Sequence, residues 1–150
     1  MFQYLNVHTA GKKAPGIALY NMSDNLVTLG NLTKESNVIV SFWASYCLPC
    51  IKELPQLAEL EKKYGSEKNV KLLLINIDKE GIEKAGSVLD RLGISSECLL
   101  DRYQVNAKKY IPDLKIPAVF LINRKGNIVY SASGEKSENM ENLEKAIKKL

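Results

Sequence analysis

The spacing of apolar residues along this chain predicts alternating strands and helices. Two runs, 37–43 and 70–77, are almost wholly apolar, and such runs are typical of strands that a sheet covers on both faces. Shorter apolar runs bounded by Gly, Pro, Asn and Ser predict further strands. These shorter strands are expected at 17–20, 26–29, 97–100, 117–122 and 128–130.

Helices are predicted where apolar residues recur every three or four positions. The longest spans 48–64, with Leu54, Leu57, Leu60 and Tyr64 on one face. Pro55 lies inside this helix and is expected to kink it, because proline lacks the N–H that the helix uses. Gly65 is expected to end it. Further helices are predicted at 78–93, 103–110 and 137–150, and a single helical turn at 31–35.

The order of these elements predicts an α/β fold. Two strands form an N-terminal hairpin, strands and helices then alternate, and a second hairpin around the turn 123–127 precedes the last helix. This alternation predicts a central sheet flanked by helices on both sides. A chain of 150 residues fits one domain over 1–150, with residues 1–10 expected to form a flexible lead-in.

Composition narrows the possible partners of the protein. Apolar residues make up 45% and charged residues 25%, as in an ordinary soluble domain. The net charge of +4 is spread along the chain, which does not favour nucleic acid as a partner. No run is apolar enough for a membrane span, and the N-terminus has no secretion-signal pattern. The protein is therefore either cytosolic or a mature domain whose signal or anchor has been removed.

Two of the three cysteines, Cys47 and Cys50, form a C-x-x-C pair between a predicted strand and a predicted helix. A thiol at a helix N-terminus has a lowered pKa, because the helix dipole favours the thiolate that attacks disulfides. Placed there, C-x-x-C is the thioredoxin-type redox arrangement. The alternative is a structural pair or half of a zinc site. Zinc needs about four ligands, yet the chain has no second C-x-x-C and only one histidine, His8.

With Pro55 and Pro117 added to the two cysteines, the chain resembles the thioredoxin superfamily. The segments 42–44, Phe-Trp-Ala, and 115–122, Lys-Ile-Pro-Ala-Val-Phe-Leu-Ile, both match its pattern. The resemblance implies a thioredoxin-like fold with a mixed sheet. It also implies a cis peptide bond before Pro117, in a loop that packs against the active-site disulfide.

Within the superfamily, residues 11–150 look most like the TlpA-like branch, which includes extracytoplasmic thiol–disulfide oxidoreductases of cytochrome c maturation. The lead-in 11–15 before a hairpin is typical of that branch. The active-site motif continues as C-x-x-C-x-x-E-x-P through Glu53 to Pro55. The segment 78–117 is longer than in a minimal thioredoxin and is expected to hold an inserted helix and strand.

Two positions depart from the family pattern. Tyr46 stands where the family usually has Trp before the first cysteine, and Ser41 replaces the buried Asp that assists proton transfer in thioredoxins. The loss of that Asp leaves Glu53 as the candidate base. Glu53 follows Cys50 by three residues, so the two side chains are neighbours on the helix surface.

The resemblance implies a role for each residue around the pair. Cys47 is the expected nucleophile and Cys50 the resolving thiol. The backbone of Ile116 is expected to pair with an incoming substrate segment. Further substrate contacts are expected from Tyr46, Leu48, Pro49 and Pro117. Packing roles near the site are expected from Trp43 and Pro55. Cys98 is expected to be a buried small hydrophobe, and His8 to have no specific role.

The function expected is that of a thiol–disulfide oxidoreductase that reduces protein disulfides in cell redox homeostasis. Residues 48–49 between the cysteines carry no positive charge, which favours a reductant over an oxidant. An upstream thiol reductant is required, and neither a cofactor nor a metal is expected. An extracytoplasmic, periplasmic or membrane-anchored setting is favoured, with apocytochrome c as one client.

Two alternatives stay open. A peroxiredoxin-type thiol peroxidase would carry P-x-x-x-T-x-x-C, but Val40 and Ala44 occupy the Pro and Thr positions. A copper-binding module on the same fold would use C-x-x-x-C with a distant histidine. This chain has C-x-x-C and no histidine after His8.

Overall fold

The computed structural model describes residues 11–150 of the chain. The predicted lead-in of residues 1–10, with His8, lies outside the described residues. The first described residues lie beside the hairpin of β6 and β7. Lys13 forms an isolated antiparallel β-bridge with Asn127, and the Ile128 N–H donates to the Lys12 carbonyl.

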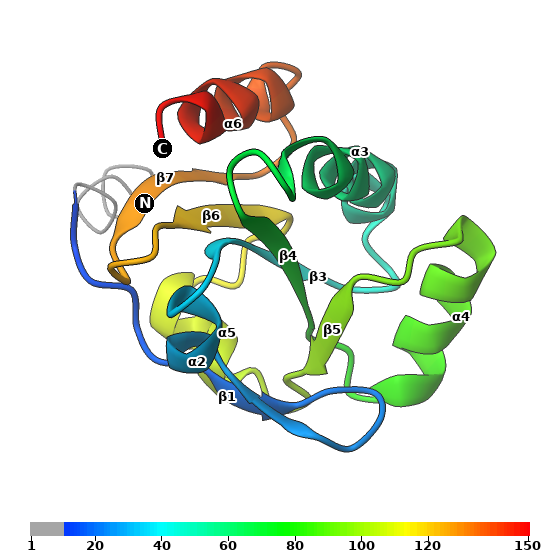
Figure 1. Ribbon diagram of the computed structural model, residues 1–150. Helices are drawn as coiled ribbons and strands as arrows, with labels where there is room; N and C mark the ends of the chain where they lie inside the picture. The colour runs from blue at the N-terminus through cyan, green and yellow to red at the C-terminus, as the bar shows by residue number, and fades with distance from the viewer. Residues whose placement is uncertain (1–10) are drawn as a thin grey trace.

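A five-stranded mixed sheet forms the centre of the molecule, in the order β5-β4-β3-β6-β7 (Figure 1). Strands β3, β4 and β5 run parallel, whereas β6 pairs antiparallel with β3 and β7 antiparallel with β6. This arrangement confirms the predicted thioredoxin-like sheet. The strands span Asn37–Trp43 (β3), Val70–Asn76 (β4), Glu97–Leu100 (β5), Ala118–Ile122 (β6) and Ile128–Ser133 (β7).

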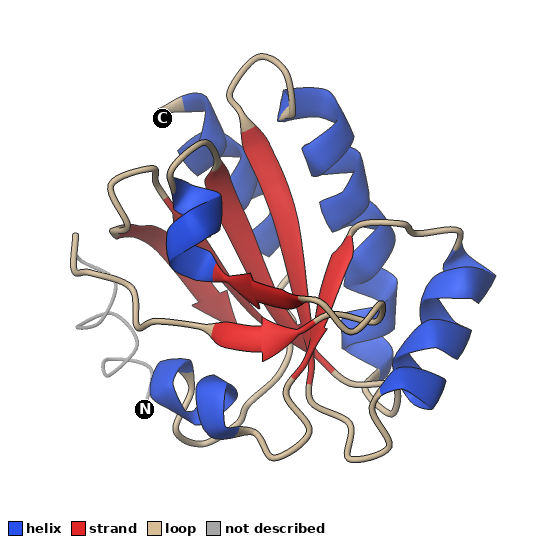
Figure 2. Cartoon of the chain, turned by 60° about the horizontal axis from the view of Figure 1, so that its bottom comes forward, coloured by secondary structure: helices blue, strands red, loops and turns tan. Residues whose placement is uncertain are grey.

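Helices cover the sheet on both faces, as predicted (Figures 1 and 2). On one side lie α3 (Leu48–Tyr64), α4 (Ile82–Leu92) and α6 (Asn139–Lys148). On the other side lie the short helices α2 (Leu29–Thr33) and α5 (Val105–Tyr110). The predicted N-terminal hairpin, β1 (Ala18–Tyr20) with β2 (Leu26–Thr28), forms a separate two-stranded sheet on this second side.

The apolar run of β3 supplies both cores because its side chains alternate between the two faces. Val40 and Phe42 pack toward α2 and α5. Ile39 and Trp43 pack toward α3 and α6. A one-residue slip of β3 would move each of its side chains to the opposite face of the sheet, so the register of this strand is fixed by its packing. The fixed register sets the position of the residues that follow Trp43.

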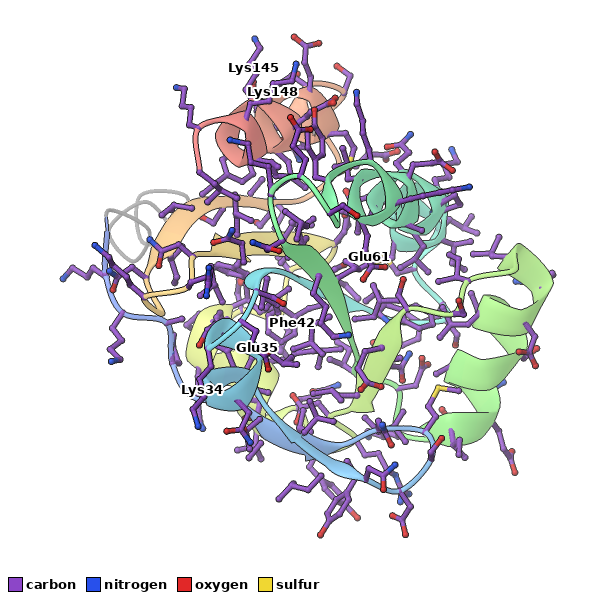
Figure 3. All side chains as sticks on the ribbon, viewed as in Figure 1. Lys34, Glu35, Phe42, Glu61, Lys145 and Lys148 are labelled. Carbon is purple, nitrogen blue, oxygen red and sulfur yellow. A yellow bond between two sulfur atoms is a disulfide. The ribbon has the colours of Figure 1, made fainter. Side chains whose placement is uncertain are left out.

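Three aromatic rings fill the core on the α2–α5 side. Phe42, Tyr110 and Phe120 lie with ring centroids 5.0 to 6.0 Å apart, in tilted or edge-to-face pairs. Figure 3 shows Phe42 inside the molecule, whereas Lys145 and Lys148 on α6 point away from the sheet. The Tyr110 hydroxyl donates to the Pro15 carbonyl and so ties α5 to the segment before β1.

Several boundaries differ from the sequence-based expectation. The helix predicted at 78–93 begins only at Ile82, because Gly81 has a φ of 62°, which an α-helix does not allow. The last strand continues to Ser133 rather than ending at 130, since it keeps pairing with β6. Helix α3 runs through Pro55 and ends before Gly65, as expected.

We expect Phe120→Ala to lower the free energy of unfolding by about 3–5 kcal/mol, because it removes one of the three packed rings and leaves a cavity beside Phe42 and Tyr110. Phe120 is 1% exposed. Val129→Ala on the neighbouring β7, where the side chain is 43% exposed, is the matched control and is expected to change stability by about 0.5 kcal/mol. Urea unfolding of both variants checks this, and equal losses would contradict the assignment of the core.

Candidate active site

The turn between β3 and α3 places Cys47 at the N-terminus of α3. Cys47 is the N-cap residue, with extended φ and ψ of −102° and 98°. Its backbone N–H donates to the Ala44 carbonyl at 3.1 Å, and its sulfur accepts from the Cys50 N–H at 3.3 Å. Pro49 falls in the first turn, where a helix needs no N–H from it.

Cys47 and Cys50 are joined by a disulfide, with Cα atoms 5.3 Å apart. The two sulfurs differ in access. Cys50 is 1% exposed, whereas Cys47 is only partly buried. The expectation that Cys47 is the more exposed of the pair is confirmed, so an outside thiol or disulfide reaches Cys47 first.

The electrostatic setting of Cys47 favours an anion once the disulfide is reduced. The N–H groups at the start of α3 point toward it, and the first turn of this helix contains no acidic residue. A cysteine in this position is stabilised as the thiolate by the positive end of the helix dipole.

Glu53 lies one turn after Cys50 on α3, and its carboxyl group is largely buried. Its Oε1 atom is buried and has no hydrogen-bond partner among residues 11–150. Burial, and secondarily the charge of Glu135, raises the pKa of Glu53 from 4.5 to about 7. A carboxyl group with such a pKa can take up and release a proton near neutral pH.

A cleft of about 550 Å³ lies beside Glu53. One wall comes from α3, and the other comes from the loop between β7 and α6 and the start of α6. The cleft reaches the C-x-x-C segment at Pro49, so Glu53 is accessible from the side of the disulfide. The lining residues are Pro49, Lys52, Glu53, Gln56, Glu135, Lys136, Ser137 and Met140.

The peptide bond between Ile116 and Pro117 is cis, which confirms the expectation drawn from the resemblance. Phe42 pairs with Ala118 across β3 and β6, so the loop before β6 meets the end of β3 close to Cys47. Ile116 and Cys47 both pack against the buried residues of the two cores. Within residues 11–150, no hydrogen bond involves the backbone of Ile116, which leaves it free to pair with another chain.

The side chains next to Cys47 in sequence form an exposed apolar rim. Tyr46 is 69% exposed and Leu48 70% exposed, whereas Pro49 is partly buried. Large apolar groups exposed beside a reactive sulfur suit contact with a polypeptide substrate. These three positions are the substrate contacts expected from the sequence.

The remaining predicted residues have surroundings that suit packing. Trp43 is fully buried between the sheet and the α3–α6 layer, and Pro55 is an exposed residue within α3. Ser41, at the position where thioredoxins have Asp, is 1% exposed. Burial raises the pKa of the Cys98 thiol to about 12, which keeps it protonated.

Two residues of the site were missed by sequence reasoning. The sequence pattern predicts Asp78 only as the first residue of a helix, but its carboxylate accepts hydrogen bonds from Ser45, two residues before Cys47. A polar residue directly after the buried run 70–77 was the available signal. Glu135 comes from a loop 82 positions after Glu53, so its approach to Glu53 had no local signal.

The described part of the chain contains neither a metal-binding cluster nor a membrane-spanning helix. Among residues 11–150, no three His, Cys, Asp or Glu side chains are grouped to hold a metal ion. No helix in the same range is both long and apolar enough to cross a bilayer.

We expect Glu53→Gln to stabilise the oxidised protein increasingly as pH rises. The folded-state pKa of Glu53, about 7, lies above the unfolded value of about 4.5. The wild type therefore loses stability between these two pH values, while the Gln variant does not. The difference is expected to grow by about 2–3 kcal/mol from pH 4 to pH 8.

Urea unfolding across this pH range measures the effect. Glu59→Gln, at an exposed position on the same helix, is the control and should leave the pH profile unchanged. A Glu53→Gln profile parallel to the wild type would show that this carboxyl group is not perturbed.

Comparison with known proteins places this geometry in a family. Residues 9–147 match the model of the Redoxin family. Thiol-disulfide oxidoreductase ResA of Bacillus thuringiensis (strain Al Hakam) is 31% identical over 140 residues, which cover 93% of this chain and 78% of the relative. ResA of Bacillus subtilis (strain 168) is 29% identical over 132 residues, covering 87% and 70%.

Solved structures agree. A candidate thiol:disulfide interchange protein DsbE from Chlorobium tepidum superposes with a TM-score of 0.83 at 27% identity, covering 93% of this chain and 95% of the other. The chain belongs to the Redoxin family and is a thiol–disulfide oxidoreductase of the ResA type.

Proposed function

We propose that this protein reduces disulfide bonds in protein substrates through the Cys47–Cys50 pair. The observation that carries the proposal is the disulfide at the start of α3, with its exposed end at Cys47 and the cis Ile116–Pro117 loop beside it. The similarity to ResA-type oxidoreductases supports the same conclusion.

The exchange proceeds in two thiol–disulfide steps. In the reduced protein, the Cys47 thiolate attacks one sulfur of the substrate disulfide, and the other substrate sulfur leaves as a thiolate. Cys50 then loses its proton and attacks the Cys47 sulfur. The Cys47–Cys50 disulfide forms and the second substrate thiolate departs. Two electrons pass to the substrate, and an upstream dithiol must return them to this protein.

Glu53 supports the second step as a proton acceptor. Cys50 is almost inaccessible to water, so its proton needs a nearby group to receive it. A pKa of about 7 lets Glu53 accept that proton and later release it to solvent through the adjoining cleft. Glu53 thus acts as the base in place of the Asp that thioredoxins have at the position of Ser41.

Substrate binding is assigned to the exposed rim and the cis-proline loop. The unpaired backbone of Ile116 can form strand-like hydrogen bonds with an extended substrate segment, which brings its disulfide over Cys47. Tyr46, Leu48 and Pro49 provide apolar contact on the other side. Hydrogen bonds between backbones discriminate little between substrate sequences. They require an extended segment, so this mode of binding suits substrates that are unfolded around their disulfide.

The direction and setting proposed are those of an extracytoplasmic reductant. No cation separates the two cysteines to stabilise the thiolate further, so the reduced form is not favoured as strongly as in an oxidant. The TlpA-like motif through Glu53 and Pro55 supports a client among exported C-x-x-C proteins, such as apocytochrome c. A thiol reductant at the membrane would supply the electrons.

We expect Cys47→Ser to abolish reduction of insulin by dithiothreitol-fed protein, because no thiolate remains to attack. Cys50→Ser should instead accumulate a mixed disulfide with the substrate. Cys98→Ser is the matched control. Cys98 is 4% exposed and so cannot reach a substrate, and this variant is expected to leave the rate of insulin reduction unchanged. Full activity of Cys47→Ser would overturn the proposal.

The same kind of assay tests whether apocytochrome c is a substrate of this protein. Wild-type protein is expected to reduce the disulfide of an apocytochrome c C-x-x-C-H segment, with loss of the reaction in Cys47→Ser. Reduction of insulin with no reduction of this client would reject the cytochrome c role and leave the reductase function standing.

The reduction potential of the pair is expected near that of thioredoxin, about −270 mV, as befits a reductant. Equilibration with glutathione or dithiothreitol buffers, followed by thiol trapping, measures it. A value near that of a strong oxidant, about −120 mV, would reverse the proposed direction of electron flow.

A further inference from the structure

A buried carboxylate holds the backbone just before Cys47. Asp78 is 2% exposed and lies two residues beyond the end of β4. Its Oδ2 accepts from the Ser45 backbone N–H at 2.8 Å, and its Oδ1 accepts from the Ser45 hydroxyl at 2.8 Å. Its Oδ2 also accepts from the side-chain amide of Asn76 at 2.8 Å. Each oxygen acts as an acceptor, which fits an ionised carboxylate.

The Asn76 side chain completes the arrangement from the other side. Asn76 is fully buried at the end of β4, and its Oδ1 accepts from the Asp78 backbone N–H at 3.0 Å. The side-chain amide of Asn76 therefore both accepts from Asp78 and donates to it. With its backbone N–H and both carboxylate oxygens bonded, the Asp78 side chain has little freedom to move.

The bonds of Asp78 fix the turn that presents Cys47. The Cys47 N–H donates to the Ala44 carbonyl, which makes a tight turn with Ser45 at its second position. The Asp78 carboxylate accepts hydrogen bonds from both the backbone N–H and the hydroxyl group of Ser45. The turn is thus anchored from β4, the neighbouring parallel strand, and the Ile77 N–H bond to the Trp43 carbonyl brings the two segments together.

The charge on Asp78 is balanced by hydrogen bonds from neutral donors. Within residues 11–150, no lysine or arginine nitrogen lies at ion-pair distance from this carboxylate. A negative charge in the interior acts over a longer range than one in water, because the effective dielectric constant is lower there. Cys47 is two residues from Ser45, which this carboxylate binds directly.

We propose that Asp78 is a positioning residue for Cys47, which holds the turn from Ala44 to Cys47 in place and disfavours the Cys47 thiolate by its buried negative charge. This inference rests on the proposed reductase function. The charge opposes the start of α3, which favours the thiolate. The reduced protein carries that thiolate and the disulfide form does not, so Asp78 makes the couple a stronger reductant.

The test is Asp78→Asn, which keeps the size of the side chain and removes the charge. We expect the equilibrium with glutathione to shift about tenfold toward the reduced protein, a rise of about 30 mV in reduction potential. The midpoint of the pH profile for Cys47 alkylation should fall in the same variant. An unchanged potential and midpoint would overturn the proposal, even if the variant unfolds at a lower temperature.

Asp101→Asn is the matched control. Asp101 is also 2% exposed, lies directly after β5, and accepts from the backbone N–H groups of Asn106 and Ala107. It lies one strand farther from β3. We expect Asp101→Asn to lower the melting temperature and leave the potential unchanged. An equal shift of potential in this variant would assign the effect to general destabilisation and overturn the proposal.

Ser45→Ala keeps the inference testable if Asp78→Asn does not fold. This variant retains the carboxylate and removes one hydrogen-bond donor that offsets its charge. The alkylation midpoint of Cys47 should therefore rise, opposite in sign to Asp78→Asn, and an unchanged or lowered midpoint would contradict the proposal. A wild-type protein with no reversible couple would instead reject the reductase function itself.

Discussion

The parallel pairing of β3 with β4 is the constraint on which the rest of the site depends. Both strands are buried on both faces, and their register aligns Trp43 with Asn76. The carboxyl ends of parallel strands meet at one edge of a sheet, so the residues that follow each strand are brought together there. The turn before Cys47 and the network of Asp78 are consequences of that single register.

The antiparallel pairing of β6 on the other side of β3 adds the second half of the site. Phe42 opposite Ala118 sets the position of the cis peptide bond relative to the start of α3. Cys47 therefore lies between the two strands that flank β3. The turn that carries Cys47 is anchored from β4, and in our proposal the loop before β6 offers its backbone to the substrate. The disulfide is held at an edge where three chain segments converge.

Opposed electrostatic effects tune this edge. The N-terminus of α3 favours a thiolate at Cys47, whereas buried carboxyl groups around it disfavour further negative charge. Glu53 avoids a buried negative charge by keeping its proton up to near neutral pH. In our proposal Asp78 keeps its charge, which only hydrogen bonds stabilise. A balance of this kind suits a protein that must give electrons away and still form a reactive thiolate.

The sequence alone determined the elements, the reactive pair and the loop of Pro117, because apolar periodicity and a C-x-x-C spacing are local patterns. It also pointed to Glu53, whose distance from Cys50 along a helix is set by helix geometry. The hydrogen bonds of Asp78 with Ser45 and the placement of Glu135 in the same cleft as Glu53 were decided only by the tertiary structure. They join residues 33 and 82 positions apart, and such approaches arise from sheet register and loop packing, which no local pattern encodes.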